Sequence, residues 1–529
     1  MSKIASQEVE ESNRMWASAS FVGVLIIIGL PLWWKTTEVY RVALPYDKIS
    51  SLDKLPHAIA TELVVLANDD PTADEIADLI EKNFENSDVI KLKIKKGVLS
   101  NALHHTLESV ADEVEAVEEI AKVFDLTQHN TFYVVQRMPL FQGVWLSGER
   151  VAFFRDTRSS TSLVDVLKNW VYQTSVLEGA RSELADNARQ VRVPPTKGHH
   201  IVLSVVHPHP EQLKVDFDAG NAVEDYIGTF VDELSVLHNF TIQSQWLYLL
   251  NFDFKPEQVS DSSDWGRHFA VRKDRLPLLL TKLESRAATH VSELPTIHLA
   301  VYATPCALSP LVIYDNDKMN HAPVQAFMSP KWGGVVLAGP TEAECRDESP
   351  TWTPQVRVVM GTFISQLRTL IGIVDMGHIE NVHLDPLRSV VPRRWEVDSL
   401  LRIRTLEQIT SAQRTLQSLA QLLGEISNIV INDDVGASIT LAVESIEDAT
   451  ELMKRGELVA AYQTSQEAFL AAETAFMEPS LLALLYFPDD QKYAIYIPLF
   501  LPIMFPVVLS LKNLLRWFRG KPVHKEKID

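Results

Sequence analysis

Two long apolar stretches, one near each end of the chain, dominate its hydrophobic pattern. Met15–Trp34 contains 20 residues and Tyr493–Leu511 contains 19, and neither carries a formal charge. Because an α-helix rises about 1.5 Å per residue, each can cross a hydrocarbon layer of roughly 30 Å. We therefore predict transmembrane helices at 15–34 and 493–511, with the large central region on one side of the membrane.

The first stretch predicts an uncleaved signal anchor. It is longer than the apolar core of about 7–15 residues in signal peptides. It ends in Trp33-Trp34-Lys35, not in a small-residue cleavage site.

Basic residues after the second stretch decide the predicted orientation. The tail 512–529 contains six lysines and arginines, whereas Lys492 just before the stretch stands near two aspartates. Positive charge favours the cytoplasmic side, so this tail is predicted to be cytoplasmic. Because the chain is predicted to cross the membrane twice, residues 1–14 are then also cytoplasmic, and the central region lies in the lumen. The charges around the first stretch favour the opposite orientation, but more weakly, with two basic residues before it and four after it.

Two short motifs agree with this topology. Asn239 begins an N-x-[ST] sequon, which is glycosylated only in the lumen. Lys525 and Lys527 have the spacing of a dilysine retrieval signal, which functions at a cytoplasmic C-terminus. A generic basic tail is the alternative interpretation of these lysines. Together the motifs predict the endoplasmic reticulum membrane as the location.

Between the apolar stretches, short β-rich runs alternate with amphipathic helical stretches. The predicted strands are Leu63–Leu66, Val89–Ile94, Phe132–Met138, Ile201–His207, Thr241–Leu250, Thr296–Ala303 and Gly333–Leu337. The predicted helices are Thr72–Phe84, Ala102–Phe124, Ser162–Arg189 and Ala222–Leu237. This alternation predicts an α/β lumenal domain over residues 35–394, built on a mixed sheet with flanking helices.

The pattern becomes purely helical over residues 395–480. The predicted helices are Glu396–Ile429, Asp434–Arg455 and Glu457–Met477, with Gly456 between the last two as the turn of a helical hairpin. Such helices either pack against the sheet domain or form a docking face for another protein. The pattern alone does not distinguish these roles.

Composition narrows the classes of function. The formal net charge of −20 disfavours nucleic acid as a partner, while the basic C-terminal tail favours contact with anionic membrane lipid. The only two cysteines are Cys306 and Cys345. In an oxidising lumen they can pair with each other, or either can pair with a partner subunit.

No catalytic or cofactor motif is present. The chain lacks HExxH, GxSxG, GxGxxG, Walker and CxxC sequences. Cys306 has no neighbouring histidine that would indicate a protease nucleophile. His199, His200, His207 and His209 form the one dense histidine group, but their spacing does not favour a metal site. We predict no catalytic residue, metal or cofactor.

Three prolines mark the second apolar stretch. Pro498, Pro502 and Pro506 are four residues apart and so fall on nearly one helical face. Each lacks an N–H group and leaves a helical carbonyl without its donor. In hydrocarbon that carbonyl requires another partner, so this face is a candidate contact with other membrane subunits or a wet cavity.

Several blocks of sequence closely resemble the PIG-S family, which supplies the S subunit of the glycosylphosphatidylinositol (GPI) transamidase complex. The blocks are Gly29–Glu38, Leu44–Tyr46, Ser329–Gly334, Leu419–Ile431, Asp433–Val435 and Leu485–Pro502. The sequon at Asn239 falls where such proteins carry one. Because the blocks extend from residue 29 to residue 502, the resemblance is end to end.

The resemblance implies a non-catalytic subunit of a complex in the endoplasmic reticulum. That complex cleaves a C-terminal signal from a precursor protein and joins the new carboxyl end to GPI. The resemblance also implies PIG-K, PIG-T, PIG-U and an aminopeptidase-like attachment subunit as partners, with catalysis in the caspase-like PIG-K. A stand-alone lumenal hydrolase acting on glycolipid or glycoprotein is the alternative. A plasma-membrane receptor is a third hypothesis, and it conflicts with the dilysine spacing.

One matching block also suggests a lumenal contact surface. Gly333 and Gly334 permit close approach of another backbone, and Trp332 can anchor a contact. The alternative is a turn leading into a strand, with the tryptophan in the core.

Overall fold

Contacts within the computed structural model divide the chain into two compact units. The first comprises Met1–Ser50, Thr415–Leu441 and Ala471–Asp529, and the second comprises Ser51–Arg414 and Ala442–Leu470. The structure describes residues 2–37, 40–181, 190–237, 239–260, 266–287, 294–315, 318–320, 322, 324–374, 377–425, 429–479, 481 and 489–519.

The second unit is mixed α/β, as expected, but it contains several sheets. The described strands form sheets of six, five, four and two strands. The predicted mixed pairing is confirmed, since both large sheets combine parallel and antiparallel strands, but the strands form several sheets and not one. Alternating hydrophobicity indicates where strands are but not which strands pair, and one core stops growing beyond about 250–300 residues.

The six-stranded sheet has the order β17-β4-β5-β3-β1-β2. Its strands are β1 (Ile59–Ala67), β2 (Ile90–Val98), β3 (Thr131–Gln136), β4 (Val144–Leu146), β5 (Val151–Phe154) and β17 (Val382–Leu384). Strands β1, β2, β3 and β5 are parallel, and β4 runs antiparallel to β5. Strand β17 pairs with β4, although more than two hundred residues separate them in sequence.

Helices cover the faces of this sheet. Helix α4 (Asp70–Phe84) packs on β1 and β2, and its N-cap Asp69 accepts a hydrogen bond from the Thr72 N–H. Helices α5 (Asn101–Ser109) and α6 (Glu113–Val123) share an apolar cluster with β3 and β5.

Two predicted helices are interrupted in the structure. The predicted helix 102–124 is split into α5 and α6, because Asp112 caps a new helix by accepting from the Val114 N–H. The predicted helix 162–189 is replaced by α7 (Ser160–Val166), a π-turn and α8 (Thr174–Arg181). The rest of that prediction lies outside the described residues.

The five-stranded sheet has the order β14-β15-β11-β6-β8. Its strands are β6 (Gly198–His207), β8 (Asn239–Tyr248), β11 (Thr296–Ala303), β14 (Gln325–Ser329) and β15 (Gly333–Ala338). All are parallel except the edge strand β14. The predicted strand at residues 296–303 is confirmed with the same bounds.

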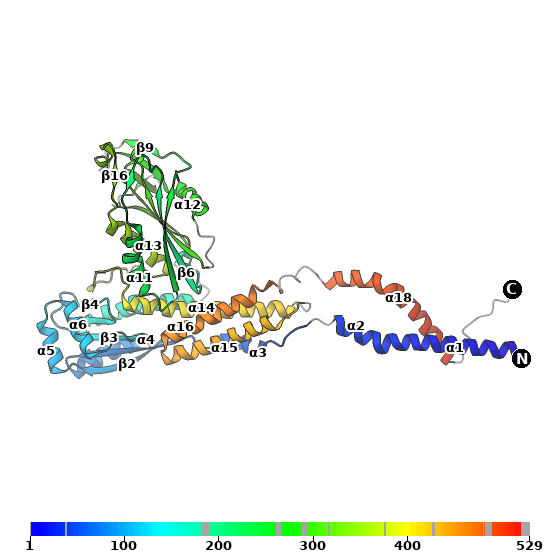
Figure 1. Cartoon of the computed structure of the whole chain (residues 1–529). Coiled ribbons are helices and arrows are strands. Elements are labelled where there is room, and N and C mark those ends of the chain that lie inside the picture. Colours follow the sequence, from blue (N-terminus) through cyan, green and yellow to red (C-terminus); the bar gives the residue numbers. More distant parts are fainter. Residues whose placement is uncertain are drawn as a thin grey trace. The chain divides into compact units, whose positions relative to one another are not determined.

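Helices also lie on both faces of the five-stranded sheet (Figure 1). Helices α10 (Ala219–Ala222), α11 (Thr229–Asp232) and α13 (Val356–Ile371) pack into the apolar cluster on one face. Helix α12 (Leu276–Arg286) packs into the cluster on the other face. The sheet is therefore the middle of three layers.

Two small sheets complete the strands of this unit. One contains β9 (Glu257–Ser260), β10 (Arg267–Arg272), β12 (Leu311–Asp315) and β13 (Lys318–Met319). The other pairs β7 (Lys214–Val215) with β16 (Thr351–Trp352).

Long helices follow the last strand, as the sequence pattern predicted. They are α14 (Arg394–Glu425), α15 (Asp433–Arg455) and α16 (Leu458–Phe476). Gly456 separates α15 from α16 with a φ of 82°, a left-handed conformation that glycine adopts without strain.

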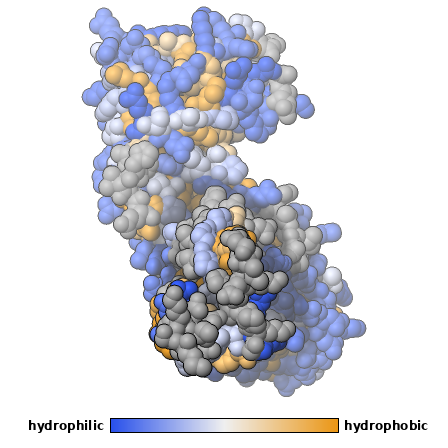
Figure 2. All heavy atoms as spheres, turned by 90° about the vertical axis from the view of Figure 1, so that its right-hand side faces the viewer, coloured by the Kyte–Doolittle hydropathy of each residue, from blue (hydrophilic) through white to orange (hydrophobic). Residues whose placement is uncertain are grey.

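The first unit contains the helices formed by the apolar end stretches. Helix α1 (Ser2–Val24), a π-turn and helix α2 (Leu30–Thr37) follow one another, and helix α18 (Asp489–Phe518) contains the three prolines. Among the described residues, Ser12–Leu32 is the one segment that meets a length and hydropathy criterion for crossing a membrane. On the face shown in Figure 2, hydrophilic residues form much of the visible surface and hydrophobic residues occupy limited areas.

The segment after α2 is held by main-chain and side-chain bonds within the first unit. The Val42 N–H donates to the Ile431 carbonyl at 3.1 Å, and the Ile431 N–H donates to the Tyr40 carbonyl at 3.1 Å. The Tyr40 hydroxyl donates to Asp433 at 2.8 Å. These contacts fix the exit from the N-terminal helix beside the start of α15.

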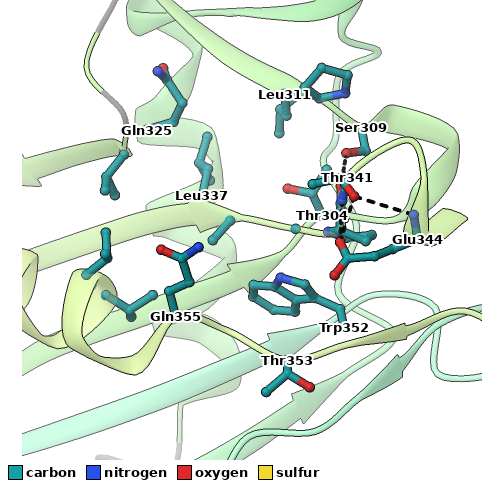
Figure 3. Close-up of a pocket in the computed structure, with 17 residues that line it drawn as sticks. Thr304, Ser309, Leu311, Gln325, Leu337, Thr341, Glu344, Trp352, Thr353 and Gln355 are labelled. Carbon is teal, nitrogen blue, oxygen red and sulfur yellow. Dashed lines mark hydrogen bonds between the residues drawn. The ribbon is translucent and has the colours of Figure 1, made fainter.

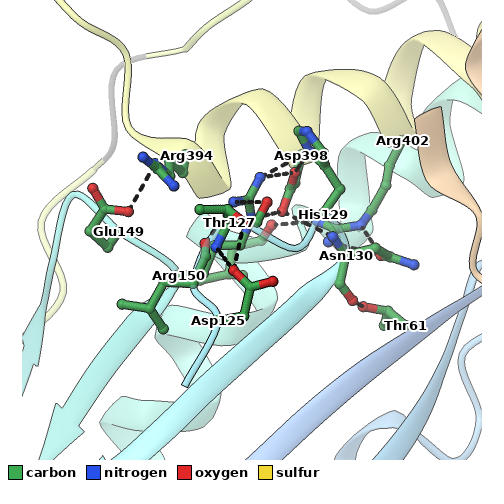
Figure 4. A network of polar contacts seen from close by, with 12 residues as sticks. Thr61, Asp125, Thr127, His129, Asn130, Glu149, Arg150, Arg394, Asp398 and Arg402 are labelled. Atoms are coloured by element: carbon green, nitrogen blue, oxygen red, sulfur yellow. Dashed lines mark hydrogen bonds and ion pairs between the residues drawn. The ribbon is translucent and has the colours of Figure 1, made fainter. Parts of the chain in front are cut away.

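A buried charge cluster fixes α14 on the six-stranded sheet (Figure 4). Arg150 donates from Nε and Nη2 to the two carboxylate oxygens of Asp398, at 2.6 and 2.8 Å. The Asn130 N–H also donates to Asp398, and the His129 ring lies 2.8 Å from it. Burial opposes ionisation of Asp398, but these hydrogen bonds outweigh that effect and hold its pKa well below its usual range.

A second arginine extends this cluster. Arg402 donates from Nε and Nη2 to the Asn130 side-chain oxygen, at 3.2 and 3.1 Å. The Asn130 amide in turn donates to the carbonyls of Ala60 and Gly456. Arg402 is 2% exposed, so its charge depends on these protein partners.

Replacing Asp398 by alanine tests the importance of the cluster. We expect Asp398→Ala to lower the free energy of unfolding by roughly 3–5 kcal/mol, because it leaves buried arginine charge uncompensated. Glu149→Ala is the matched control, since Glu149 and Arg394 form an ion pair with both side chains 39% exposed, and its loss should cost at most about 1 kcal/mol. Denaturant unfolding of the detergent-solubilised full chain measures both changes. Equal changes would contradict the prediction.

Candidate functional site

A pocket lies at the carboxyl edge of the five-stranded sheet (Figure 3). Thr304 directly follows β11, and Gly339 directly follows the neighbouring parallel strand β15. The pocket has a volume of about 370 Å³. Carboxyl ends of parallel strands are a frequent location for ligands in α/β proteins, so this pocket is the candidate site.

Hydroxyl and amide groups supply most of the polar surface of the pocket. Thr341 donates from its N–H and its hydroxyl to one carboxylate oxygen of Glu344, at 2.7 and 3.0 Å. The Ser309 hydroxyl donates to the Pro340 carbonyl. Glu344 is the one ionisable residue in the described lining. The pocket can bind a ligand by hydrogen bonding through these groups.

The amino end of α13 forms another wall of the pocket. Gln355 is the N-cap residue of that helix and makes no side-chain capping bond. Val358 and Val359 of the first turn also line the pocket, and Trp352, which is 5% exposed, closes its inner side. Apolar and polar groups therefore alternate around the cavity.

A disulfide joins Cys306 and Cys345, whose Cα atoms are 5.5 Å apart. Cys306 follows β11 in a short 3-10 turn, and Cys345 lies in a second such turn after β15. The bond therefore links the two loops that border the pocket. Both sulfurs are used, so neither cysteine is available as a nucleophile or for an intermolecular bond.

The predicted contact residues Gly333 and Gly334 are buried, and Trp332 is half-buried. Trp332 stacks on His298 with ring centroids 4.9 Å apart. A Cβ at Gly333 would collide with the main-chain carbonyl of His298, and one at Gly334 would collide with the Gln366 side chain. Close packing between β15 and its neighbours therefore explains both glycines. A partner contact through Trp332 stays a prediction.

The histidine group is dispersed. His199 is buried, and burial, together with the nearby Arg404 charge, lowers the pKa of His199 to about 4. His200 is half-buried and contacts Thr241 and Gln243, whereas His207 contacts the Leu213 carbonyl. Across the part of the chain that the structure describes, no group of three or more His, Cys, Asp or Glu residues is placed to hold a metal ion.

The remaining predicted residues lie on exposed elements or beyond the described chain. Asn239 is exposed at the first position of β8. Pro498, Pro502 and Pro506 lie inside α18 and are exposed in the isolated chain. Lys525 and Lys527 lie outside the described residues.

Comparison with known proteins decides the family. The family described as "Phosphatidylinositol-glycan biosynthesis class S protein", PIG-S, matches residues 20–521. The chain belongs to the PIG-S family. It is 33% identical to the GPI-anchor transamidase component PIGS of Mus musculus and, likewise, 33% identical to that of Homo sapiens, with 99% of both chains covered in each case. A Schizosaccharomyces pombe PIG-S homologue is 24% identical, over 99% of this chain and 90% of its own.

The pocket residues of this PIG-S chain were not identified from the sequence. Thr304 lies in the loop after β11, whereas Thr341 and Glu344 lie together in the loop after β15. The available signal was the position of Thr304 and Gly339 at the ends of two predicted strands. Using that signal required knowing that these strands are parallel neighbours, which depends on pairing between distant segments.

The glycine pair offers a test of the packing interpretation. We expect Gly333→Ala to lower the free energy of unfolding by roughly 3 kcal/mol or more, because the collision is with backbone and the φ of Gly333 is 150°. Gly334→Ala should cost less, about 1–3 kcal/mol, because the Gln366 side chain can move. Denaturant unfolding compares the two variants. Wild-type stability in Gly333→Ala would refute the interpretation.

Proposed function

We propose that this chain is the PIG-S subunit of a GPI transamidase complex, which attaches GPI anchors to precursor proteins in the endoplasmic reticulum membrane. The observation that carries the proposal is the match with two mammalian components of that complex, at 33% identity over 99% of each chain. A family match over residues 20–521 includes most of the first apolar stretch, all of the second and the whole region between them.

The chain acts without catalytic residues of its own, and PIG-K performs the cleavage and transfer. The relatives are named as components of the transamidase, and that name is consistent with a non-catalytic subunit. The partners of this chain are PIG-K, PIG-T, PIG-U and the aminopeptidase-like attachment subunit.

The chain crosses the membrane twice, with both ends cytoplasmic and the α/β unit in the lumen. The N-terminal helix supports this topology through its apolar segment Ser12–Leu32. Helix α18 supports it through its length of 30 residues and its uncharged run 493–511. Domain limits of 35–394 for the α/β part and 395–480 for the helical part belong to the same proposal.

Recovery of the other subunits tests the proposed role. A tagged full chain, extracted in mild detergent, should co-purify with PIG-K, PIG-T and PIG-U. An unrelated endoplasmic reticulum protein with two spans and the same tag is the control for non-specific recovery. Absence of all three subunits from the wild-type purification would overturn the proposal.

Glycosylation tests the orientation independently. Because Asn239 is exposed on a lumenal strand in the proposed topology, it should carry an N-glycan. Endoglycosidase treatment should increase the electrophoretic mobility of the wild-type chain and leave Asn239→Gln unchanged. If both chains have the same mobility before and after treatment, this site does not face the lumen.

A further inference from the structure

Strand β8 (Asn239–Tyr248) forms one edge of the five-stranded sheet. It pairs with β6 alone among the described strands, in parallel over all ten of its residues. A strand of about 5–6 residues is typical of globular proteins, so this edge is long. Leu249, which directly follows it, has a φ of 59° and is 67% exposed.

The direction of the main-chain groups of β8 follows from one bond. The Leu249 N–H donates to the His207 carbonyl at the end of β6, at 3.1 Å. Since the main-chain groups of successive residues point to opposite sides of a strand, those of Ile242, Ser244, Trp246 and Tyr248 point away from β6. No described residue makes a main-chain hydrogen bond with these outward groups.

The side chains of β8 lack the usual protection of an exposed edge. None of its ten residues is charged, and none is proline. Natural edge strands are commonly short, bulged, or interrupted by lysine or proline, which prevents pairing with another chain. Here Trp246 and Tyr248 stack with ring centroids 6.0 Å apart, and Tyr248 is 56% exposed. The edge is therefore open to strand addition.

We propose that the edge of β8 binds an extended segment of another subunit of the transamidase complex as an added strand. This inference rests on the proposed function. The outward N–H and C=O groups complement an extended main chain, and Ile242–Tyr248 offers them over a length of roughly 20 Å.

Charge identifies the class of occupant. A second copy of this chain would bring together two molecules that each carry a formal net charge of −20, and their mutual repulsion opposes that pairing. Because β8 itself is uncharged, it offers no partner for acidic or basic side chains on the added strand. The occupant is thus a β-forming segment of a different chain that is uncharged where it pairs with β8.

A proline in β8 tests the proposal directly. Ser244→Pro removes one outward N–H and leaves the hydrogen bonds to β6 in place, so the sheet itself should tolerate it. Ser244→Ala keeps the N–H and is the matched control. We expect Ser244→Pro to reduce recovery of at least one transamidase subunit about tenfold or more, and Ser244→Ala to recover wild-type amounts.

Folding controls make these outcomes interpretable. Gln243→Pro removes an N–H that points toward β6 and is the control for a damaged sheet. Limited proteolysis of the full chain should show Ser244→Pro as resistant as wild type and Gln243→Pro more sensitive. Wild-type recovery of every subunit by Ser244→Pro overturns the strand addition and leaves the proposed function intact. Failure of the wild-type chain to recover any subunit overturns both.

Amide hydrogen exchange of the wild-type chain tests the same edge without substitution. Peptides covering residues 239–249 should exchange more slowly in the purified complex than in the separate full chain. Equal exchange in the two samples overturns the proposal. A second copy would be the occupant if exchange in the separate chain were slow, became slower at higher protein concentration, and the chain had the mass of a dimer. That result also overturns the proposal.

Discussion

The buried charge of Asp398 constrains the arrangement of α14 in the second unit. An isolated carboxylate in this position would be strongly unfavourable, so its stability depends on Arg150 and the neighbouring N–H groups. One helical turn later, Arg402 reaches Asn130, which also bonds to β1 and to Gly456 in the turn of the hairpin. Directional hydrogen bonds therefore set the axial position of α14 on the six-stranded sheet more strictly than apolar packing alone can.

Helix α14 also packs against the five-stranded sheet. Val397, Leu400 and Leu401 of α14 belong to the apolar cluster that covers one face of the five-stranded sheet, together with residues of α13. Helix α14 thus presents buried ionic groups to the six-stranded sheet, and both apolar side chains and the Glu396–Arg368 ion pair to α13. The apolar cluster also positions one wall of the pocket, because α13 packs into that cluster and its amino end lines the cavity.

Local elements could be predicted from the sequence, whereas their pairing could not. Alternating and helical hydrophobic periods identified β11 with its bounds and the α15–α16 hairpin, since both depend on neighbouring residues. The break at Asp112 was missed because the apolar period continues across it. The pocket was missed because Thr304 and Glu344 meet only after distant strands pair. The family came from matching blocks of sequence, since the chain contains none of the HExxH, GxSxG, GxGxxG, Walker or CxxC motifs.

The late return of β17 has a consequence for biosynthesis. Its partner β4 is synthesised far earlier, and every strand of the five-stranded sheet lies between them in the chain. Translation supplies the N-terminal part first, so one edge of the first sheet waits for its last strand while the next sheet emerges. During that interval the nascent polypeptide exposes an unpaired β-edge, which makes it a natural client for chaperones before any assembly begins.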